Sequence, residues 1–385
     1  MSPTEYPLAG ITVVEICHSV AGPYAGSILA QLGAEVLKIE NPPNGDHSRS
    51  WAPPYWHDIS CSYQCLNRDK SGLTANFKVS EDVESLQQLI LDRVDVVIQN
   101  IKPGSIERSS IGSKALLAAK PSLIYCNLSA FGSTGPLALK PGYDPLMQAF
   151  GGLMSVTGEK HGNPVRVGPA VIDLGSGMWA VIGILAALQR RANTGIGGVV
   201  DTSLFETALA WMTIPLTNFM ATGELSYPMG SGISEIVPHQ AFQVSDGYLM
   251  VAAGNDGLFK KLCSAMCRDY LMQDGRYASN EGRVRNRESL IESLETRFQE
   301  ESKDYWMAQL DHAGVPNAPM QNVEQVLNHP QTKALNIVQD LPNGEMRLPG
   351  LPLSFDGVRP GLRRKAPTIG QDNPKYFKSS SSLAN

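Results

Sequence analysis

The sequence has few cysteines, no excess of positive charge and no long uninterrupted hydrophobic run. Its 6 cysteines are spread over 385 residues, which fits free thiols in a reducing compartment better than a disulfide framework. The net charge of -5 argues against a nucleic-acid-binding protein, which normally carries a basic balance. The longest apolar stretch, residues 178–188, is shorter than the about 20 residues that span a bilayer. We therefore expect a cytoplasmic protein that binds neither nucleic acid nor a membrane.

Motifs of several common enzyme classes are also missing. The chain has no H-E-x-x-H and no G-x-S-x-G, which are typical of zinc peptidases and serine hydrolases. Two C-x3-C pairs, Cys61/Cys65 and Cys263/Cys267, have no histidines near them at a zinc-binding spacing. Residues 1–10 lack the basic and apolar regions of a signal peptide. We therefore expect neither a metal site nor a secretory signal.

The sequence does contain an alternation of strand and helix patterns through its first half. Residues 10–18 and 34–40 read as strands, and residues 21–33 between them have an apolar face at helical spacing. Further strand patterns at residues 73–79, 95–100 and 121–132 accompany a helical one at residues 82–94. This alternation predicts an α/β fold, with a doubly wound parallel sheet forming a large domain over residues 1–200.

The pattern changes after about residue 218, where proline and glycine become frequent. A hairpin is expected around Asp246 and Gly247, and polar helical segments follow it. We predict a smaller α+β domain over residues 225–325. Residues 326–385 are expected to return to the large domain and to end in a disordered, serine-rich tail.

The first strand, helix and strand have the outline of a dinucleotide-binding unit. The turn into the helix reads AGPYAG at residues 21–26, without the G-x-G core of the fingerprint. Pro23 also removes one of the backbone N–H groups that would surround a pyrophosphate. An NAD-dependent dehydrogenase therefore stays only as an outside alternative.

Asp173 lies just before a very apolar helical segment and allows two interpretations. It follows the short run AVI and precedes the glycine-containing LGSG, which suggests a strand end beside a helix N-terminus. Ligands of open α/β sheets bind at such places, where a carboxylate can act as base, nucleophile or anchor. The other interpretation is a structural one, because Asp is favoured in the first turn of any helix.

Two cationic loops also allow two interpretations. Asn100, Lys102 and Arg108 follow a buried strand pattern, and residues 66–78 carry a second cluster of Arg68, Lys70 and Lys78. Cations beside strand ends suit a phosphate-bearing ligand. The alternative is a solvated loop whose charged side chains point into water.

Five segments in order make a more specific pattern: residues 10–49, 95–112, 130–158, 165–198 and 237–256. Together they resemble the family III CoA-transferases, a group that includes formyl-CoA transferase and carnitine CoA-transferase. The resemblance extends over about residues 8–330. It implies an interlocked homodimer that uses CoA and acyl-CoA as substrates and holds no permanently bound cofactor. We expect the acceptor to be a small carboxylic acid of the dicarboxylic class.

The resemblance also implies site residues. Asp173 is the catalytic residue, and the CoA contacts are Lys78, Asn100, Ile101, Lys102, Arg108, Tyr143 and Asp144. The implied reaction passes through an aspartyl anhydride and an aspartyl-CoA thioester, with oxyanions stabilised by N–H groups of residues 174–177 or of Gly151 and Gly152. One basic CoA contact of some members is replaced here by Asn41.

The α-methylacyl-CoA racemases of the same family are the main alternative. The resemblance aligns a GHD motif of these racemases with GYD at residues 142–144 of this chain, and their histidine is the second acid/base. A tyrosine hydroxyl has an ordinary pKa near 10, against about 6.5 for histidine, so it exchanges protons poorly near neutral pH. We therefore expect a transferase, with a non-catalytic CoA-binding protein as the outside alternative. The donor and acceptor acids stay open.

Overall fold

The computed structural model describes residues 6–102 and 104–377, which divide into two compact units. The first unit holds the described residues of 6–153, 167–222 and 330–377, and the second holds residues 154–166 and 223–329. The predicted tail at residues 378–385 lies outside the described residues. The C-terminal segment, with α16 (Pro330–Ala334), β12 (Val338–Asp340), β13 (Arg347–Pro349) and α17 (Asn373–Tyr376), belongs to the first unit.

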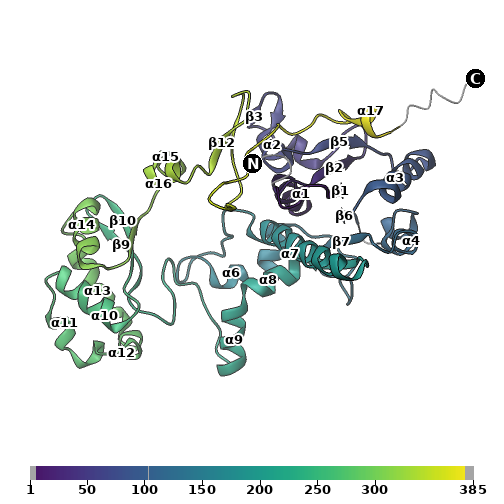
Figure 1. The fold of residues 1–385 in the computed structure, drawn as a ribbon. Helices are drawn as coiled ribbons and strands as arrows, with labels where there is room; N and C mark the ends of the chain where they lie inside the picture. Colours follow the sequence, from purple (N-terminus) through teal and green to yellow (C-terminus); the bar gives the residue numbers. More distant parts are fainter. Residues whose placement is uncertain (1–5, 103, 378–385) are drawn as a thin grey trace, which may run out of the picture. The chain divides into compact units, whose positions relative to one another are not determined.

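A six-stranded parallel sheet forms the centre of the first unit (Figure 1). Its order is β5-β2-β1-β6-β7-β8, so the chain builds outward from β1 in one direction and then from β6 in the other. The strands are β1 (Thr12–Ile16), β2 (Glu35–Glu40), β5 (Ser71–Thr74), β6 (Val96–Gln99), β7 (Ile124–Ser129) and β8 (Gly198–Ser203). The doubly wound parallel sheet predicted from the sequence is confirmed.

Helices cover both faces of this sheet because side chains alternate along each strand. Val14 and Ile16 of β1 pack in one apolar cluster with Leu86 and Ile90 of α3 (Ser80–Arg93). Glu15 between them faces α1 (Ala21–Gln31) on the other side. The remaining helices are α2 (Cys61–Asn67), α4 (Ser113–Ala119), α5 (Asp144–Phe150), α7 (Val171–Thr194), α8 (Leu204–Trp211) and α9 (Thr213–Thr222), and α6 (Leu153–Val156) lies where the chain passes into the second unit.

Four charged side chains are buried together between β1, β2, β5 and the loop after β2. The Lys38 ammonium lies 3.0 Å from Glu15 Oε1 and 2.7 Å from Asp46 Oδ2, and Lys70 lies 2.6 Å from Glu15 Oε2. Burial alone would lower the pKa of Lys38, but Glu15 and Asp46 raise it well above its ordinary value. Burial lowers the pKa of Lys70 to about 8. The cluster contains two cationic and two anionic groups, so its net charge is zero when all four are ionised.

Gly26 makes room for this cluster on α1. A Cβ at that position would collide with Glu15 Oε2 and would lie 3.2 Å from Lys70 Nζ. The helix therefore approaches the ion cluster more closely than any residue with a side chain allows.

The second unit is a small α+β domain with its own core. Its antiparallel sheet has the order β11-β10-β9, and β9 and β10 form the hairpin predicted around Asp246 and Gly247. Phe298 stacks on Phe242 at 4.6 Å between ring centroids, and its carbonyl accepts a hydrogen bond from Trp306 Nε1. The elements are β9 (His239–Val244), β10 (Gly247–Ala252), β11 (Asn317–Pro319), α10 (Asp256–Ala265), α11 (Tyr270–Gln273), α12 (Asn280–Arg285), α13 (Arg287–Phe298), α14 (Lys303–Ala313) and α15 (Val323–Asn328).

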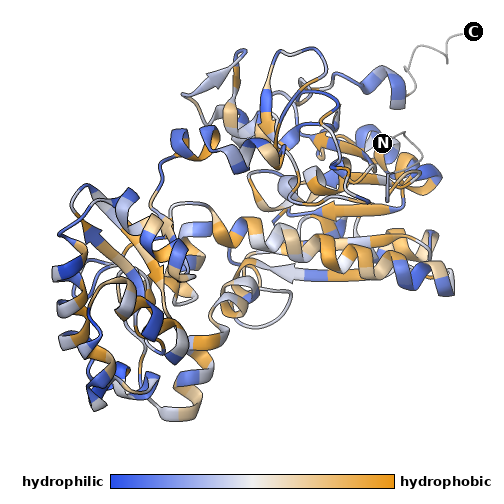
Figure 2. Cartoon of the chain, turned by 60° about the vertical axis from the view of Figure 1, so that its left-hand side comes forward, coloured by the Kyte–Doolittle hydropathy of each residue, from blue (hydrophilic) through white to orange (hydrophobic). Residues whose placement is uncertain are grey.

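Helix α7 is longer than the apolar run seen in the sequence and is only partly buried. Its 24 residues make it long and apolar enough, by length and composition, to cross a membrane, whereas the sequence led us to expect no such segment. Half of its most apolar window is buried in the protein, and the core helix of a soluble protein meets the same criteria. The helix is therefore a weak indication of a membrane span. Figure 2 shows its mixed surface of apolar and polar residues.

The ion cluster gives a test of what holds the first unit together. Lys38→Met leaves the buried carboxylates of Glu15 and Asp46 short of a partner, so we expect the free energy of unfolding to fall by about 3–5 kcal/mol. Arg347→Met breaks an ion pair with Asp340 in which both side chains are more than half exposed, and should leave urea unfolding unchanged. An equal change in the free energy of unfolding in the two variants would contradict the stabilising role that we give to the buried ion cluster.

Candidate active site

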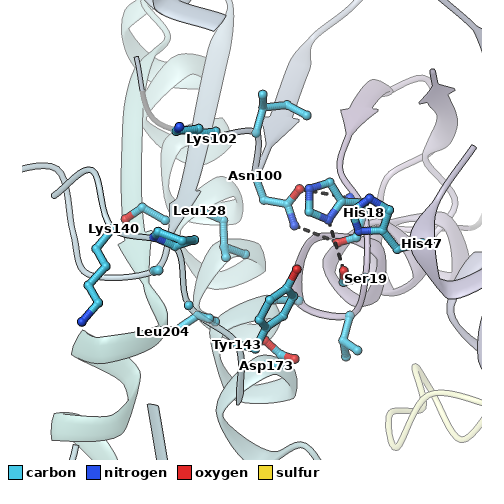
Figure 3. Close-up of a pocket in the computed structure, with 17 residues that line it drawn as sticks. His18, Ser19, His47, Asn100, Lys102, Leu128, Lys140, Tyr143, Asp173 and Leu204 are labelled. Atoms are coloured by element: carbon cyan, nitrogen blue, oxygen red, sulfur yellow. Dashed lines mark hydrogen bonds between the residues drawn. The ribbon is translucent and has the colours of Figure 1, made fainter. Parts of the chain in front are cut away.

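A cavity of about 240 Å³ opens beyond the carboxyl ends of the strands, at the point where the strand order reverses between β1 and β6. Doubly wound sheets bind their ligands at this point, because the loops after the two central strands diverge there. The walls include His18 after β1, Asn100 after β6, Leu128 in β7, and Asp173 from α7 (Figure 3). All of these residues belong to the first unit.

Asp173 lies in the first turn of α7, not at the end of a strand. The run AVI before it, which the sequence suggested was a strand end, ends the loop at Ala170 and begins the helix at Val171. The N-cap position is Ala170, which has no side chain able to cap, so Asp173 does not cap the helix. Within residues 6–102 and 104–377, no group donates a hydrogen bond to its carboxylate.

The helix is instead capped by Asp144, the first residue of α5. Asp144 Oδ2 accepts hydrogen bonds from the backbone N–H groups of Ile172 at 2.8 Å and Asp173 at 3.2 Å. Its Oδ1 accepts one from Gln148 Nε2 at 2.6 Å, and Gln148 Oε1 accepts one from the Val167 amide at 2.8 Å. Two first-turn donors of α7 are thus satisfied by another helix, which leaves the Asp173 carboxylate free to face the cavity.

This arrangement changes the acidity of Asp173. Burial and the nearby charge of Asp144 raise the pKa of Asp173 to about 7. Close to neutral pH the group therefore exists in both forms, and its ionised form is poorly solvated. A carboxylate with these properties is suited to act as a nucleophile or as a general base.

Two close approaches keep the start of α7 in place. A Cβ on Gly177 would lie 2.7 Å from the carbonyl oxygen of Ala21, so α7 crosses the start of α1 at a distance that only glycine permits. Ser176 Oγ lies 2.8 Å from the carbonyl of Ile172 and 2.7 Å from Thr207 Oγ1 on α8. Asp173 is therefore fixed relative to the loop after β1.

The predicted site residues fall into two groups. The cavity is lined by Asp173, Asn100, Ile101, Lys102 and Tyr143. Lys78, Arg108 and Asp144 are not among the lining residues. Lys78 and Arg108 are exposed, while Asp144 is buried behind Asp173 as a cap.

Two other expectations from the sequence are corrected. Lys70 and Arg68, which were considered as ligand-binding cations, are buried, and Lys70 bonds to Glu15, Asn67 and the Pro23 carbonyl. The backbone N–H groups expected to stabilise oxyanions are engaged in local bonds. Leu174 donates to Ala170, and Gly151 and Gly152 donate to Met147 and Ala149.

The sequence analysis missed several lining residues, including His18, Ser19, His47, Gly142 and Lys140. Asn100 clamps the loop after β1, because its Oδ1 accepts from the His18 amide at 3.0 Å and its Nδ2 donates to the His18 carbonyl at 2.8 Å. His18 was recognisable as the last residue of the strand predicted at residues 10–18, as Asn100 was at the end of the strand at residues 95–100. Nothing local in the sequence marks His47.

A doubly wound sheet with a buried carboxylate in a cavity at its switch point is typical of an enzyme that acts on a small molecule. The family model of CoA-transferase family III matches residues 8–373. The chain belongs to this family and is a CoA-transferase, as the sequence resemblance predicted.

Individual relatives agree with the family. An acyl-CoA transferase of Fusarium pseudograminearum is 37% identical over 96% of this chain and 84% of its own. The human succinyl-CoA:glutarate CoA-transferase is 32% identical over 97% of this chain and 85% of its own. A CAIB/BAIF family protein of Brucella suis has a crystal structure with a TM-score of 0.85 and 36% identity, covering 96% of this chain and 98% of its own. Others are named acetyl-CoA:oxalate and succinyl-CoA:mesaconate CoA-transferases, at 34% and 31% identity.

The cap gives a prediction about pH dependence. Asp144→Asn removes the second carboxylate but keeps an oxygen that can accept a backbone hydrogen bond. Because the charge of Asp144 contributes to raising the pKa of Asp173, we expect the acid limb of kcat/KM for CoA transfer to move to lower pH. Asp144→Leu removes the cap and should lose activity at every pH and about 1–2 kcal/mol of stability.

The measurement is the pH profile of kcat/KM for the parent and both variants, with Glu107→Gln as a control. Glu107 is exposed and is not among the lining residues, so its substitution should leave the profile in place. An unshifted acid limb in Asp144→Asn would show that Asp144 does not influence the ionisation of Asp173.

Proposed function

We propose that this enzyme transfers CoA from an acyl-CoA to a small dicarboxylic acid, with Asp173 as the nucleophile. The observation that carries the proposal is the buried carboxylate of Asp173, which lines the cavity and receives no hydrogen bond from the described residues. The relatives named for glutarate, oxalate and mesaconate support a dicarboxylic acceptor.

The first half of the reaction transfers CoA to the enzyme. An oxygen of the Asp173 carboxylate attacks the thioester carbonyl of the donor, the C–S bond breaks, and CoA leaves as the thiolate. The thiolate then attacks the Asp173 carbonyl carbon of the mixed anhydride, and the donor acid leaves as its carboxylate. The enzyme now holds CoA as an aspartyl thioester, so one difficult exchange is divided into easier steps.

The second half reverses these steps with the acceptor. A carboxylate of the acceptor attacks the aspartyl thioester, releasing the thiolate and forming a second anhydride. The thiolate attacks the acceptor carbonyl, and the C–O bond to Asp173 breaks, which regenerates its carboxylate. No step consumes water or a net proton. The burial of Asp173 at 9% exposure supports this scheme, because water would hydrolyse either anhydride.

The ionisation of Asp173 limits this chemistry on the acid side. Only the carboxylate form attacks, so the rate of anhydride formation should rise with pH through about 7. We assign the cavity walls formed by Asn100, Ile101, Lys102 and Tyr143 to the binding of CoA. Lys102 and Lys140 supply positive charge for its phosphates.

We also propose that two chains form an interlocked homodimer. Large apolar side chains are exposed on consecutive helices of the first unit, including Ile182 at 51%, Ile214 at 65% and Met220 at 76%. Helix α9 has no buried residue at all, although half of its residues are apolar in type. Surfaces of this kind are normally covered by another chain.

Removing the nucleophile tests the proposed reaction. Asp173→Ala should abolish CoA exchange between succinyl-CoA and glutarate, by a factor of at least about 1,000, because Asp173 is the one carboxylate among the lining residues. CoA binding should survive. Asp201→Ala, which changes an exposed aspartate outside the cavity, serves as the control. Borohydride or hydroxylamine trapping during turnover should label Asp173 in the parent enzyme, as read by mass spectrometry.

Exchange at the parental rate in Asp173→Ala would overturn the role of Asp173. Absence of a trapped species together with incorporation of deuterium at the carbon next to the thioester would instead favour acid/base chemistry and the racemase alternative.

Light scattering tests the assembly. The purified chain should have about twice its monomer mass of 41.6 kDa, and interlocking predicts that tagged and untagged dimers do not exchange chains unless they are first unfolded. A monomer would refute the dimer, while rapid exchange of chains would refute the interlocking.

A further inference from the structure

Two imidazole rings lie side by side in the wall of the cavity (Figure 3). His18 follows β1 and His47 follows the loop after β2, and their ring centroids are 4.5 Å apart with planes inclined by 35°. Both residues line the cavity that contains Asp173. Neither imidazole ring takes part in the reaction steps proposed above.

The fold itself holds this pair together. Asn100 fixes both backbone polar groups of His18. Asp46, the residue before His47, accepts a hydrogen bond at 3.0 Å from the amide of Ser19, the residue after His18. The same Asp46 accepts from the Ser48 amide at 2.8 Å and from Lys38 in the buried cluster at 2.7 Å. The two loops are therefore fixed to each other before any ligand binds.

The side chains leave room for a ligand. The Nδ1 atom of His18 is 3.1 Å from Ser19 Oγ, which leaves the other ring nitrogen for other partners. His18 is partly buried and His47 is exposed. No carboxylate of the described residues forms an ion pair with either ring, and the charge of Asp46 is already paired with Lys38.

The charges around the pair favour an anion. Besides the two histidines, the lining residues include Lys102 and Lys140, and Asp173 is the one carboxylate among them. Asp144 lies behind the helix start and does not line the cavity. The lining of the cavity as a whole therefore carries more cationic than anionic side chains.

We propose that His18 and His47 together bind an anionic oxygen group of the substrates and take up a proton when they do so. The group is either the second carboxylate of a dicarboxylic acid or a phosphate of CoA, since both offer oxygen acceptors to an imidazolium. This inference rests on the proposed function for the identity of these ligands.

The electrostatic surroundings of His18 in the absence of a bound anion support proton uptake when an anion binds. Burial, then the neighbouring His47, lower the pKa of His18, and Lys38 acts in the same direction while Asp46 opposes them. Burial and His47 therefore favour the neutral form of the unliganded His18 ring. An anion placed against the rings stabilises the imidazolium, so binding should strengthen as pH falls.

Asp173 must be removed from the measurement, because protonation of its carboxylate would also favour anion binding at low pH. We would therefore use Asp173→Ala as the parent, which also prevents turnover. Calorimetry at about pH 6 and about pH 8, in buffers of different ionisation enthalpy, gives both the affinity and the protons taken up. One proton taken up corresponds to at most about tenfold in affinity per pH unit.

A comparison of ligands shows whether the bound anion is a carboxylate of the acid or a phosphate of CoA. Glutarate is compared with pentanoate, which has one carboxylate fewer, and CoA is compared with 3′-dephospho-CoA and pantetheine. Each is titrated into the parent and into its His18→Gln and His47→Gln derivatives. His312→Gln, an exposed change in the second unit, is the control.

We expect His47→Gln to lower the affinity for one of the ligands by about tenfold at about pH 6 and by less than about twofold at about pH 8. The proton uptake that accompanies binding of that ligand should be lost. A loss of affinity for glutarate alone would identify its second carboxylate as the bound group. A loss of affinity for CoA or dephospho-CoA alone would identify a phosphate. Unchanged affinity and proton uptake for every ligand in His47→Gln, which is exposed and should fold normally, would overturn the inference. Failure of the Asp173-containing enzyme to transfer CoA would overturn the proposed function instead, and would leave the binding result unaffected.

Discussion

The geometry of the cavity depends on the ammonium group of Lys38. This buried group bonds to Glu15, to Asp46 and, at 3.0 Å, to the carbonyl of Cys17. It therefore joins β1 and β2 to the two loops that carry His18 and His47. Apolar packing is not directional, whereas these bonds fix distances and angles. Without Lys38, three buried acceptors would each lose a donor, so the two loops would be held less firmly.

A second polar contact determines what Asp173 can do. The Asp144 carboxylate accepts the first-turn amides of α7, including that of Asp173, and its charge then acts on the neighbouring carboxyl group. Asp144 thus contributes to the position of Asp173 and, together with burial, to its raised pKa. The same contact explains why Asp144, which the sequence resemblance implied was a CoA contact, is buried and away from the cavity surface.

The fold was predictable because its signals are local, whereas the local sequence around Asp173 left two interpretations open and only the family resemblance favoured a catalytic role. Strand and helix periodicity gave the order of elements, and the position of Asn100 directly after β6 placed it at the carboxyl edge of the sheet. The other contributions depend on residues distant in sequence. Lys70 reads as a surface cation until Glu15, on a different strand, is placed beside it. His18 and His47 are scattered residues until Asp46 brings their loops together. No pattern along the chain carries such pairings.

Asp173, the proposed nucleophile, also weakens the structure that holds it. A native pKa of about 7, above the ordinary value of 3.8, means that the folded chain binds a proton more tightly at Asp173 than the unfolded chain does. Stability therefore falls as pH rises from about 4 to about 7, and the whole penalty is present above that range. The carboxylate is reactive for the same reason that it is destabilising, since burial and Asp144 deprive it of solvation. The ion cluster and the close approach at Gly177 fix the surrounding elements strongly enough for the fold to tolerate this charge.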